Sequence, residues 1–278
     1  MNINPNRNNI NFGWSCETHR VIMETAIKDM PQFAKYKDAL EHFVQQPDHD
    51  DIGFLANKHF YFGEKEQPEQ DIFLKHEEPK EEKTVSFTDK LKALGTFSLG
   101  ALNTATVFKK ITNNNALSFM DFNGKNNAKA AYYDHLDKID MAIEDEDDDA
   151  TIENAARACH FLQDVTQPQH IQETSAVGKA IDLKIHTDYE RFAEDIVDDC
   201  AKNYVPEVRN PRSCTQLFQN NFEETKDVGK ITRKNEPYWD EITQQQFNLA
   251  VQSTKEFLQN VSDQMGLEYR GMEHHDHD

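Results

Sequence analysis

The sequence predicts an all-α fold, a single-domain helical bundle around a cleft lined with potential metal ligands. Apolar residues recur at helical spacing through most of the chain, and no segment alternates convincingly as a strand would. No apolar run is long enough to span a bilayer. Between Cys159 and Glu190, two pairs of potential ligands stand four residues apart, which places each pair on one face of a helix.

The composition is that of an acidic globular chain of 278 residues, long enough for one large domain or two small ones. Its formal charge of −20 repels nucleic acid phosphates and anionic lipid and concentrates divalent cations. Solubility alone explains this charge more simply. We therefore expect no preference for nucleic acid as a partner, and the oligomeric state is left open.

The first thirteen residues are polar and rich in Asn, without the apolar centre of a secretory signal peptide. The protein then stays inside the cell, leaves by another route, or is numbered without its leader. We expect a secreted or extracellular location, with a cytoplasmic stage before export as the alternative.

The first predicted helix begins at Trp14 and carries His19 one turn in. Pro31 ends it, and a second helix is predicted over residues 32–44. Taken alone, His19 is an ordinary solvated polar residue. The apolar stripe of the first helix consists of Val21, Ile22, Ala26, Ile27 and Met30.

A loop is predicted over residues 47–60, with Asp48 and His59 among its polar side chains. Residues 64–83 are charged, contain proline and lack a period, which also predicts a loop. Residues 87–110 are apolar with many small side chains. They are predicted to form a core helix or, in the second interpretation, a flap that touches lipid.

Three more helices are predicted: over residues 128–143, from a cap at Thr151 to Gln167-Pro168, and over residues 180–200. Thr151 is the predicted N-cap of the second of these helices, after an acidic loop. The last amphipathic helix is predicted over residues 239–265. One side of the helix over residues 128–143 carries Ala130, Tyr133, Leu136, Ile139 and Ile143.

The four cysteines include no C-x-x-C pair, so a thiolate metal site is not expected. Cys200 and Cys214 flank a short loop with two prolines and could form a disulfide. Cys16 and Cys159 each lie close in sequence to a candidate ligand and could meet in space. The even count only weakly favours an oxidising location.

The ligand-rich stretch organises the chain. Gln167-Pro168 ends the helix of the first ligand pair and leaves a further histidine at the turn. Two helical pairs and a histidine after a proline turn favour a metal site over two ordinary amphipathic helices. The five potential ligands are His160, Asp164, His170, His186 and Glu190.

Imidazole and carboxylate ligands without thiolates are typical of catalytic rather than structural zinc. Several zinc ions that share a bridging carboxylate suit the hydrolysis of phosphate esters, because they lower the pKa of bound water and offset charge on the leaving oxygen. A separate carboxylate can orient the water for in-line attack. The residues thus indicate a phosphomono- or phosphodiesterase, and spacing alone does not select its substrate.

The segment H-F-L-Q-D-V-T-Q-P-Q-H resembles the H-x-x-x-D-x-x-x-x-x-H signature of the bacterial zinc-dependent phospholipases C, whose fold and signature the fungal single-strand nucleases share. The resemblance spans about residues 14–200 and keeps the family order. Its further members are Trp14 with His19, the P-D-x-D turn at Asp48, the H-F pair at His59, and H-x-x-x-E at His186 and Glu190.

The resemblance implies three zinc ions in the cleft of an all-α bundle. The first ion would be bound by His59, His160 and Asp164, with Asp48 alongside. The second would be bound by His170, His186 and Glu190. The third would be bound by Trp14, His19 and the bridging Asp164. Asp48 also matches the residue proposed in the family as the general base.

The implied activity is that of a zinc phospholipase C, which cleaves the glycerol-side phosphodiester of phospholipids to diacylglycerol and a phosphorylated headgroup. Its partner would be a membrane surface or a lipid aggregate. Glu190 favours this over a single-strand nuclease or nucleotidase of the same fold, where aspartate usually closes the ligand set. A non-catalytic zinc-binding protein is the third interpretation. His49 stands where some choline-specific members carry an aromatic residue, so choline selectivity is not implied.

In the family, the leading tryptophan binds zinc through its amino nitrogen and carbonyl oxygen. Trp14 is internal, and a peptide nitrogen is a poor ligand because its lone pair is delocalised. We expect cleavage at Gly13-Trp14 to free the amine. The expected organisation is a polar extension over residues 1–13, a catalytic domain over 14–268 in which 64–127 is an insertion or flap, and a His- and Asp-rich tail over 269–278.

Overall fold

A computed structural model of the chain describes residues 14–51, 58–61, 63, 127–171, 179–207 and 209–267. The chain divides into two units, Met1–Glu64 with Asp121–Asp278, and Lys65–Met120. The second unit lies wholly outside the described residues, and so do the predicted extension, the apolar segment over 87–110 and the C-terminal tail.

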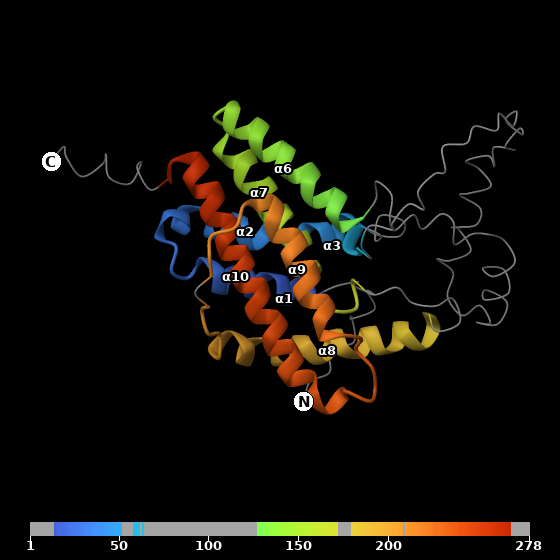
Figure 1. The fold of residues 1–278 in the computed structure, drawn as a ribbon. Coiled ribbons are helices and arrows are strands. Elements are labelled where there is room, and N and C mark those ends of the chain that lie inside the picture. The colour runs from blue at the N-terminus through green and yellow to red at the C-terminus, as the bar shows by residue number, and fades with distance from the viewer. Residues whose placement is uncertain are drawn as a thin grey trace, which may run out of the picture. The chain divides into compact units, whose positions relative to one another are not determined.

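The described residues form helices and connecting segments, with no strand among them (Figure 1), so the all-α prediction is confirmed for these ranges. None of their helices is long and apolar enough to cross a membrane. In chain order the helices are α1 (Cys16–Ile27), the 3-10 helix η1 (Pro31–Tyr36), α2 (Lys37–Phe43), α3 (Gln46–Asp50), α6 (Ala128–Glu144), α7 (Asp148–Asp164), α8 (Lys179–Lys202), α9 (Cys214–Val228), the 3-10 helix η4 (Glu236–Tyr238) and α10 (Trp239–Met265).

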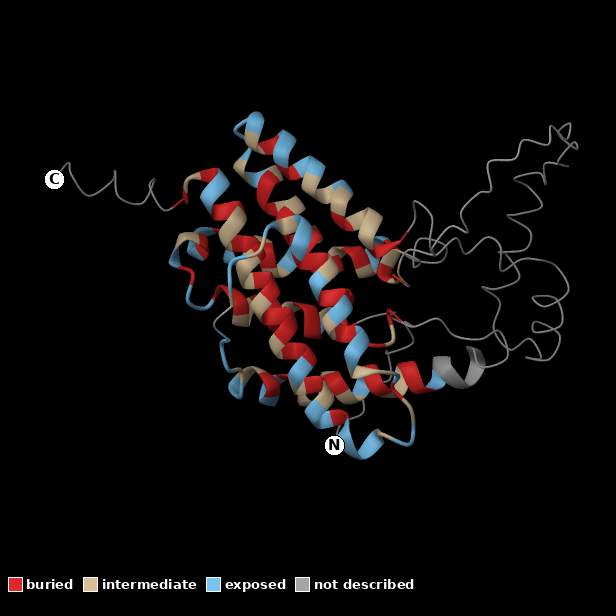
Figure 2. Ribbon diagram, in the orientation of Figure 1, coloured by how far each residue is buried: buried red, intermediate tan, exposed pale blue. Residues whose placement is uncertain are grey.

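Helix α7 is the centre of the described unit. It packs against α2, α6, α9 and α10, and every residue over 158–168 is buried, as the red stretch of α7 indicates in Figure 2. Three alanines on α7 keep its surface narrow where neighbouring helices approach: Ala155, Ala156 and Ala158. Large side chains such as Leu162 and Phe257 fill the surrounding core, and each stabilises the fold by roughly 1.5–3 kcal/mol when fully buried.

A second core joins α1 and α8 to α10, which runs past both. Trp14, Ile22 and Phe247 are buried there, with Val197 of α8 against them. The predicted apolar stripe of α1 is buried along its whole length. The two cores together fix α1 between α7's ligand-bearing end and the last helix.

Side chains at the helix starts supply the expected hydrogen bonds, but not always from the expected residue. Ser15 caps α1, and Asn127 caps α6 through a 2.9 Å hydrogen bond from the Ala130 amide. Asp147, rather than the predicted Thr151, caps α7, because its carboxylate accepts from the Ala150 amide at 2.9 Å. The Thr151 hydroxyl instead donates to the Asp147 carbonyl at 2.8 Å.

Other boundaries also differ from the predictions. The single helix predicted over 32–44 is η1 followed by α2, and Pro47 lies in the first turn of α3, where the prediction placed a loop. Proline suits that position because its fixed φ is helical and its missing amide is not needed there. On α6 the fully buried ring is that of Tyr132, one residue from the predicted stripe. Helix α9 was not predicted.

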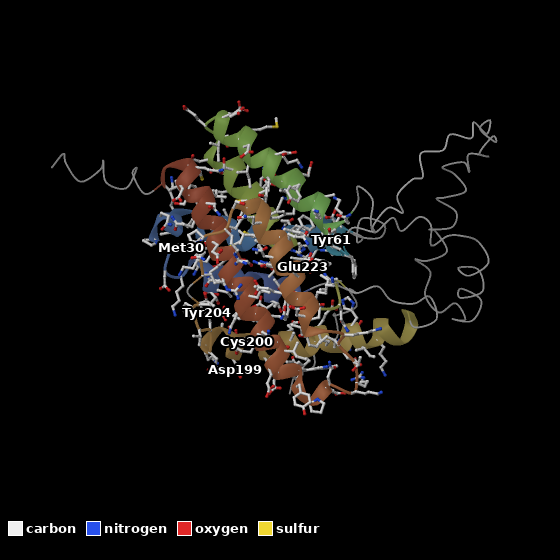
Figure 3. All side chains as sticks on the ribbon, viewed as in Figure 1. Met30, Tyr61, Asp199, Cys200, Tyr204 and Glu223 are labelled. Atoms are coloured by element: carbon white, nitrogen blue, oxygen red, sulfur yellow. The ribbon has the colours of Figure 1, made fainter. Side chains whose placement is uncertain are left out.

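None of the four cysteines forms a disulfide, so the Cys200–Cys214 bridge that the sequence allowed is not made. Cys200 is buried in the core of α1, α8 and α10, and Figure 3 marks it beside Asp199 and Tyr204 at the end of α8. Cys214 packs instead against the core around α7. Cys159 is buried in this same core. Its burial, with a smaller contribution from the nearby Cys214 thiol, raises the pKa of Cys159 well above its ordinary value. The long connection after α8 therefore carries Cys214 away from Cys200.

We predict that Asp147→Ala lowers the free energy of unfolding by about 1 kcal/mol, because it leaves an amide of the first turn of α7 without its cap. Asp137→Ala, at an exposed position on α6, should change it by less than about 0.5 kcal/mol. Urea unfolding monitored by circular dichroism measures both. Equal effects of the two changes would contradict the assigned cap.

Candidate metal centre

Side chains from six segments of the chain meet at the C-terminal end of α7. Helix α1 supplies His19, α3 supplies Asp48, and the segment 58–61 supplies His59. The end of α7, the turn after it and helix α8 supply the other side chains. Three groups could each hold a metal ion: a first group of Asp48, His59 and His160, a second group of His170, His186 and Glu190, and a third group of His19, His160 and Asp164.

Asp164 connects these groups, because its two oxygens face different histidines. Its Oδ2 lies 2.8 Å from Nδ1 of His59 and 3.1 Å from Nε2 of His160. Its Oδ1 lies 3.5 Å from Nε2 of His19 and 3.4 Å from Nδ1 of His170. A carboxylate placed in this way could serve two metal ions, one through each oxygen.

The first group is completed by Asp48. Oδ1 of Asp48 lies 3.8 Å from Nδ1 of His59 and 3.7 Å from Nε2 of His160. Its other oxygen, Oδ2, accepts a hydrogen bond from the thiol of Cys16 at 3.4 Å. One oxygen of Asp48 is therefore directed at the histidines while the other is held from α1.

His160 belongs to two groups, and the backbone fixes its orientation. Its Nδ1–H donates to the Val44 carbonyl at 2.8 Å, which leaves Nε2 as the nitrogen that faces Asp164 and His59. Its ring stacks on that of His19 with centroids 3.9 Å apart. A backbone partner of this kind sets the tautomer of a metal-binding histidine.

The second group lies between the turn after α7 and helix α8. Nε2 of His186 is 2.6 Å from Oε1 of Glu190, one helical turn later, and the rings of His170 and His186 are 5.3 Å apart. The backbone of His170 is fixed at both ends, since its amide donates to Gln167 and its carbonyl accepts from Tyr61, each at 2.9 Å.

The charge of this centre is balanced among its own groups. Burial raises the pKa of Asp164, but His160 and His59 outweigh it and hold the pKa well below its ordinary value. Burial lowers the pKa of His59, but Asp164 and Asp48 together raise it to about 8. For His170, burial prevails and lowers the pKa to about 4.

Several buried atoms of the centre lack hydrogen-bond partners. These atoms are Nε2 of His19, Oδ1 of Asp164 and both ring nitrogens of His170. A buried polar atom without a partner costs roughly 1–3 kcal/mol, so an ion bound by these atoms would stabilise the centre. Nitrogen and oxygen ligands of this number and softness fit zinc.

The structure thus brings together every predicted side-chain ligand, and their roles as ligands stay predictions. Trp14 was expected to contribute main-chain atoms. Its indole Nε1–H donates to the Gln163 carbonyl and the Thr166 hydroxyl, each at 3.1 Å, which anchors the start of α1 to the end of α7. Gly13, at the expected cleavage point, lies outside the described residues.

The partners that orient the ligands were not predicted. The position of Cys16 close to a candidate ligand suggests only a meeting with Cys159, and the Val44 carbonyl carries no signal in the sequence. Gln163 stands beside a ligand in the H-F-L-Q-D pattern, and a polar residue at that place in an otherwise apolar turn was a signal that could have been used.

Comparison with known proteins supports the fold. No protein-family model matches the chain, and no curated protein matches it by sequence. Among solved structures, the Alpha Toxin from Clostridium Absonum matches over 88% of this chain with a TM-score of 0.55 and 14% sequence identity. This chain spans 64% of the length of that structure. The predicted family resemblance is therefore confirmed as far as the fold is concerned.

We predict that the titration of His59 and His170 makes the metal-free protein lose stability on both sides of about pH 6.5. His59 binds its proton more tightly in the folded state, so its stabilising contribution is complete below pH 6.5 and is lost as pH rises through about 8. His170 binds its proton less tightly when folded, so stability also falls as pH drops from 6.5 towards about 4.

Urea unfolding of chelator-treated protein between pH 5 and 9 measures this profile. His59→Gln should flatten the alkaline side while the acid side persists. An unchanged alkaline decline in this variant would contradict the assigned proton on His59.

Proposed function

We propose that this protein is a zinc-dependent phospholipase C that hydrolyses the glycerol-side phosphodiester of phospholipids to diacylglycerol and a phosphorylated headgroup. The observation that carries the proposal is the position of Asp164, whose two oxygens face histidines of all three groups. The ligand pattern in the sequence and the fold shared with an alpha toxin support it.

Zinc would be held by the first, second and third groups, with Asp164 shared between ions. It would supply a bound water of lowered pKa and would offset charge on the phosphoryl and leaving oxygens. The contribution of the chain is to keep the imidazole and carboxylate ligands dry and correctly aimed. Val44 does so for His160, and the turn after α7 does so for His170.

Asp48 is the residue proposed to act on the attacking water, as general base or as a further ligand. Its side chain is buried, and the Cys16 thiol occupies one of its oxygens. The other oxygen is free to accept a proton from water or to complete the first group. Both roles need the same position, so metal content and turnover must be measured together.

Phospholipid is proposed as substrate in preference to nucleic acid. The charge of −20 disfavours a polyanionic strand, and Glu190 is the residue that the phospholipases carry where the nucleases usually have aspartate. The substrate would be met at a membrane surface or lipid aggregate. A secreted or extracellular location is part of the same proposal.

The experiment that tests the proposal compares two substrates. Zinc-loaded protein is incubated with mixed phospholipids of short acyl chain and, separately, with single-stranded DNA, each with a chelator control. We expect diacylglycerol and phosphorylated headgroup, which chelator abolishes. Cleavage of DNA alone would identify a nuclease, and no hydrolysis of either would favour a non-catalytic zinc-binding protein.

We predict that Asp164→Asn loses zinc from more than one group. The amide keeps the shape of the side chain but removes the charge that two ions would share. Mass spectrometry of the native protein counts the bound zinc. Asp148→Asn is the matched control, because that carboxylate is bound by Tyr36 at 2.8 Å outside the centre. Wild-type zinc content in Asp164→Asn would refute the bridge.

We also predict that Asp48→Asn lowers kcat by about 10²- to 10⁴-fold, the usual contribution of a general base, and lowers zinc content far less. The asparagine keeps an oxygen near the histidines but cannot take a proton. Turnover and zinc content are measured on the same sample. Losses of equal size would make Asp48 a ligand only.

A further inference from the structure

Gln163 is a buried side chain that contacts a predicted metal ligand without being one. It lies on α7 directly before Asp164 and is fully buried. Its Oε1 accepts a hydrogen bond from Nδ1–H of His19 at 2.7 Å. The other ring nitrogen of His19, Nε2, has no hydrogen-bond partner and lies 3.5 Å from Oδ1 of Asp164.

Thr254 of α10 binds the nitrogen end of the Gln163 amide. Nε2 of Gln163 donates to the Thr254 hydroxyl at 3.1 Å. The amide thus lies between two partners, with its oxygen towards Nδ1 of His19 and its nitrogen towards Thr254. These two hydrogen bonds link His19 on α1, Gln163 on α7 and Thr254 on α10.

The main chain of Gln163 holds the same part of α1. Its carbonyl accepts from the Trp14 indole at 3.1 Å and from the Thr166 hydroxyl at 2.7 Å. Trp14, just before α1, and His19, on α1, are the two residues from this part of the chain that are expected at the third zinc. One residue of α7 thus contacts both of them, by its side chain and by its backbone.

We propose that Gln163 is a positioning residue for the third group. It holds the proton of His19 on Nδ1, so that the lone pair of Nε2 faces Asp164 and an ion bound there. This inference rests on the proposed zinc centre but concerns metal affinity rather than the substrate. The amide oxygen of Gln163 accepts this hydrogen bond and does not itself bind the ion.

The test measures zinc affinity ion by ion, without substrate. Gln163→Leu removes the acceptor while keeping a similar volume. We expect it to weaken one of three zinc ions by about 10- to 100-fold in a chelator competition, with the other two unchanged. Thr254→Val should weaken the same ion by a smaller factor, and Gln163→Glu, which keeps the acceptor, should restore most of the affinity.

Asn221→Leu is the matched control. Asn221 is an equally buried amide that donates to the Leu162 carbonyl and the Ser253 hydroxyl, so it joins α9 to α7 and α10 through residues that belong to none of the three groups. We expect it to lower stability and leave all zinc affinities unchanged. Wild-type affinity in Gln163→Leu, or an equal zinc loss in Asn221→Leu, would overturn the inference. Neither result depends on whether phospholipid is the substrate.

Discussion

The buried charge of Asp164 is the constraint on which the rest of the centre depends. A carboxylate taken out of water costs several kcal/mol unless other groups compensate it. Asp164 also lies at the C-terminal end of α7, where the helix macrodipole disfavours a negative charge. Histidines, and the cations that histidines bind, are what this position requires, and four histidines from separate segments lie within 3.5 Å of its two oxygens.

The fold meets this requirement by burying the whole end of α7. Helix α1, the segment around His59 and the turn at His170 each bring one histidine to the same carboxylate. In two of these histidines, the ring nitrogen that does not face Asp164 makes a hydrogen bond to a neighbour. His160 bonds to the Val44 carbonyl, and His19 bonds to the side chain of Gln163. Orientation therefore comes from neighbours that would not bind metal, and the cost of ordering the ligands is met by folding rather than by metal binding.

The sequence predicted the parts of this centre that depend on local spacing. His160 with Asp164 and His186 with Glu190 are one helical turn apart, and the structure places both pairs on α7 and α8 as expected. That Asp48 and His59 lie together was predicted only from the resemblance to the phospholipase family. Taken alone, each of them is an ordinary polar residue of a predicted loop. Burial of Tyr132 rather than Tyr133 shows why: which face of α6 is covered is decided by its neighbours.

What the sequence could not predict was set by contacts across the fold. Cys200 and Cys214 are close enough in sequence to form a disulfide, but the connection between α8 and α9 places them in different cores. Gln163 can position a ligand only because its side chain contacts His19 of α1 and Thr254 of α10. Such partners are defined by packing between elements, for which a single sequence carries no period.

Anomalous diffraction at the zinc edge from crystals of zinc-loaded protein tests the central claim most directly. The account predicts three zinc ions around the end of α7, with Asp164 bound to more than one of them and Nε2 of His19 bound to the ion on the α1 side. One isolated zinc ion, or three ions none of which contacts Asp164, would contradict it.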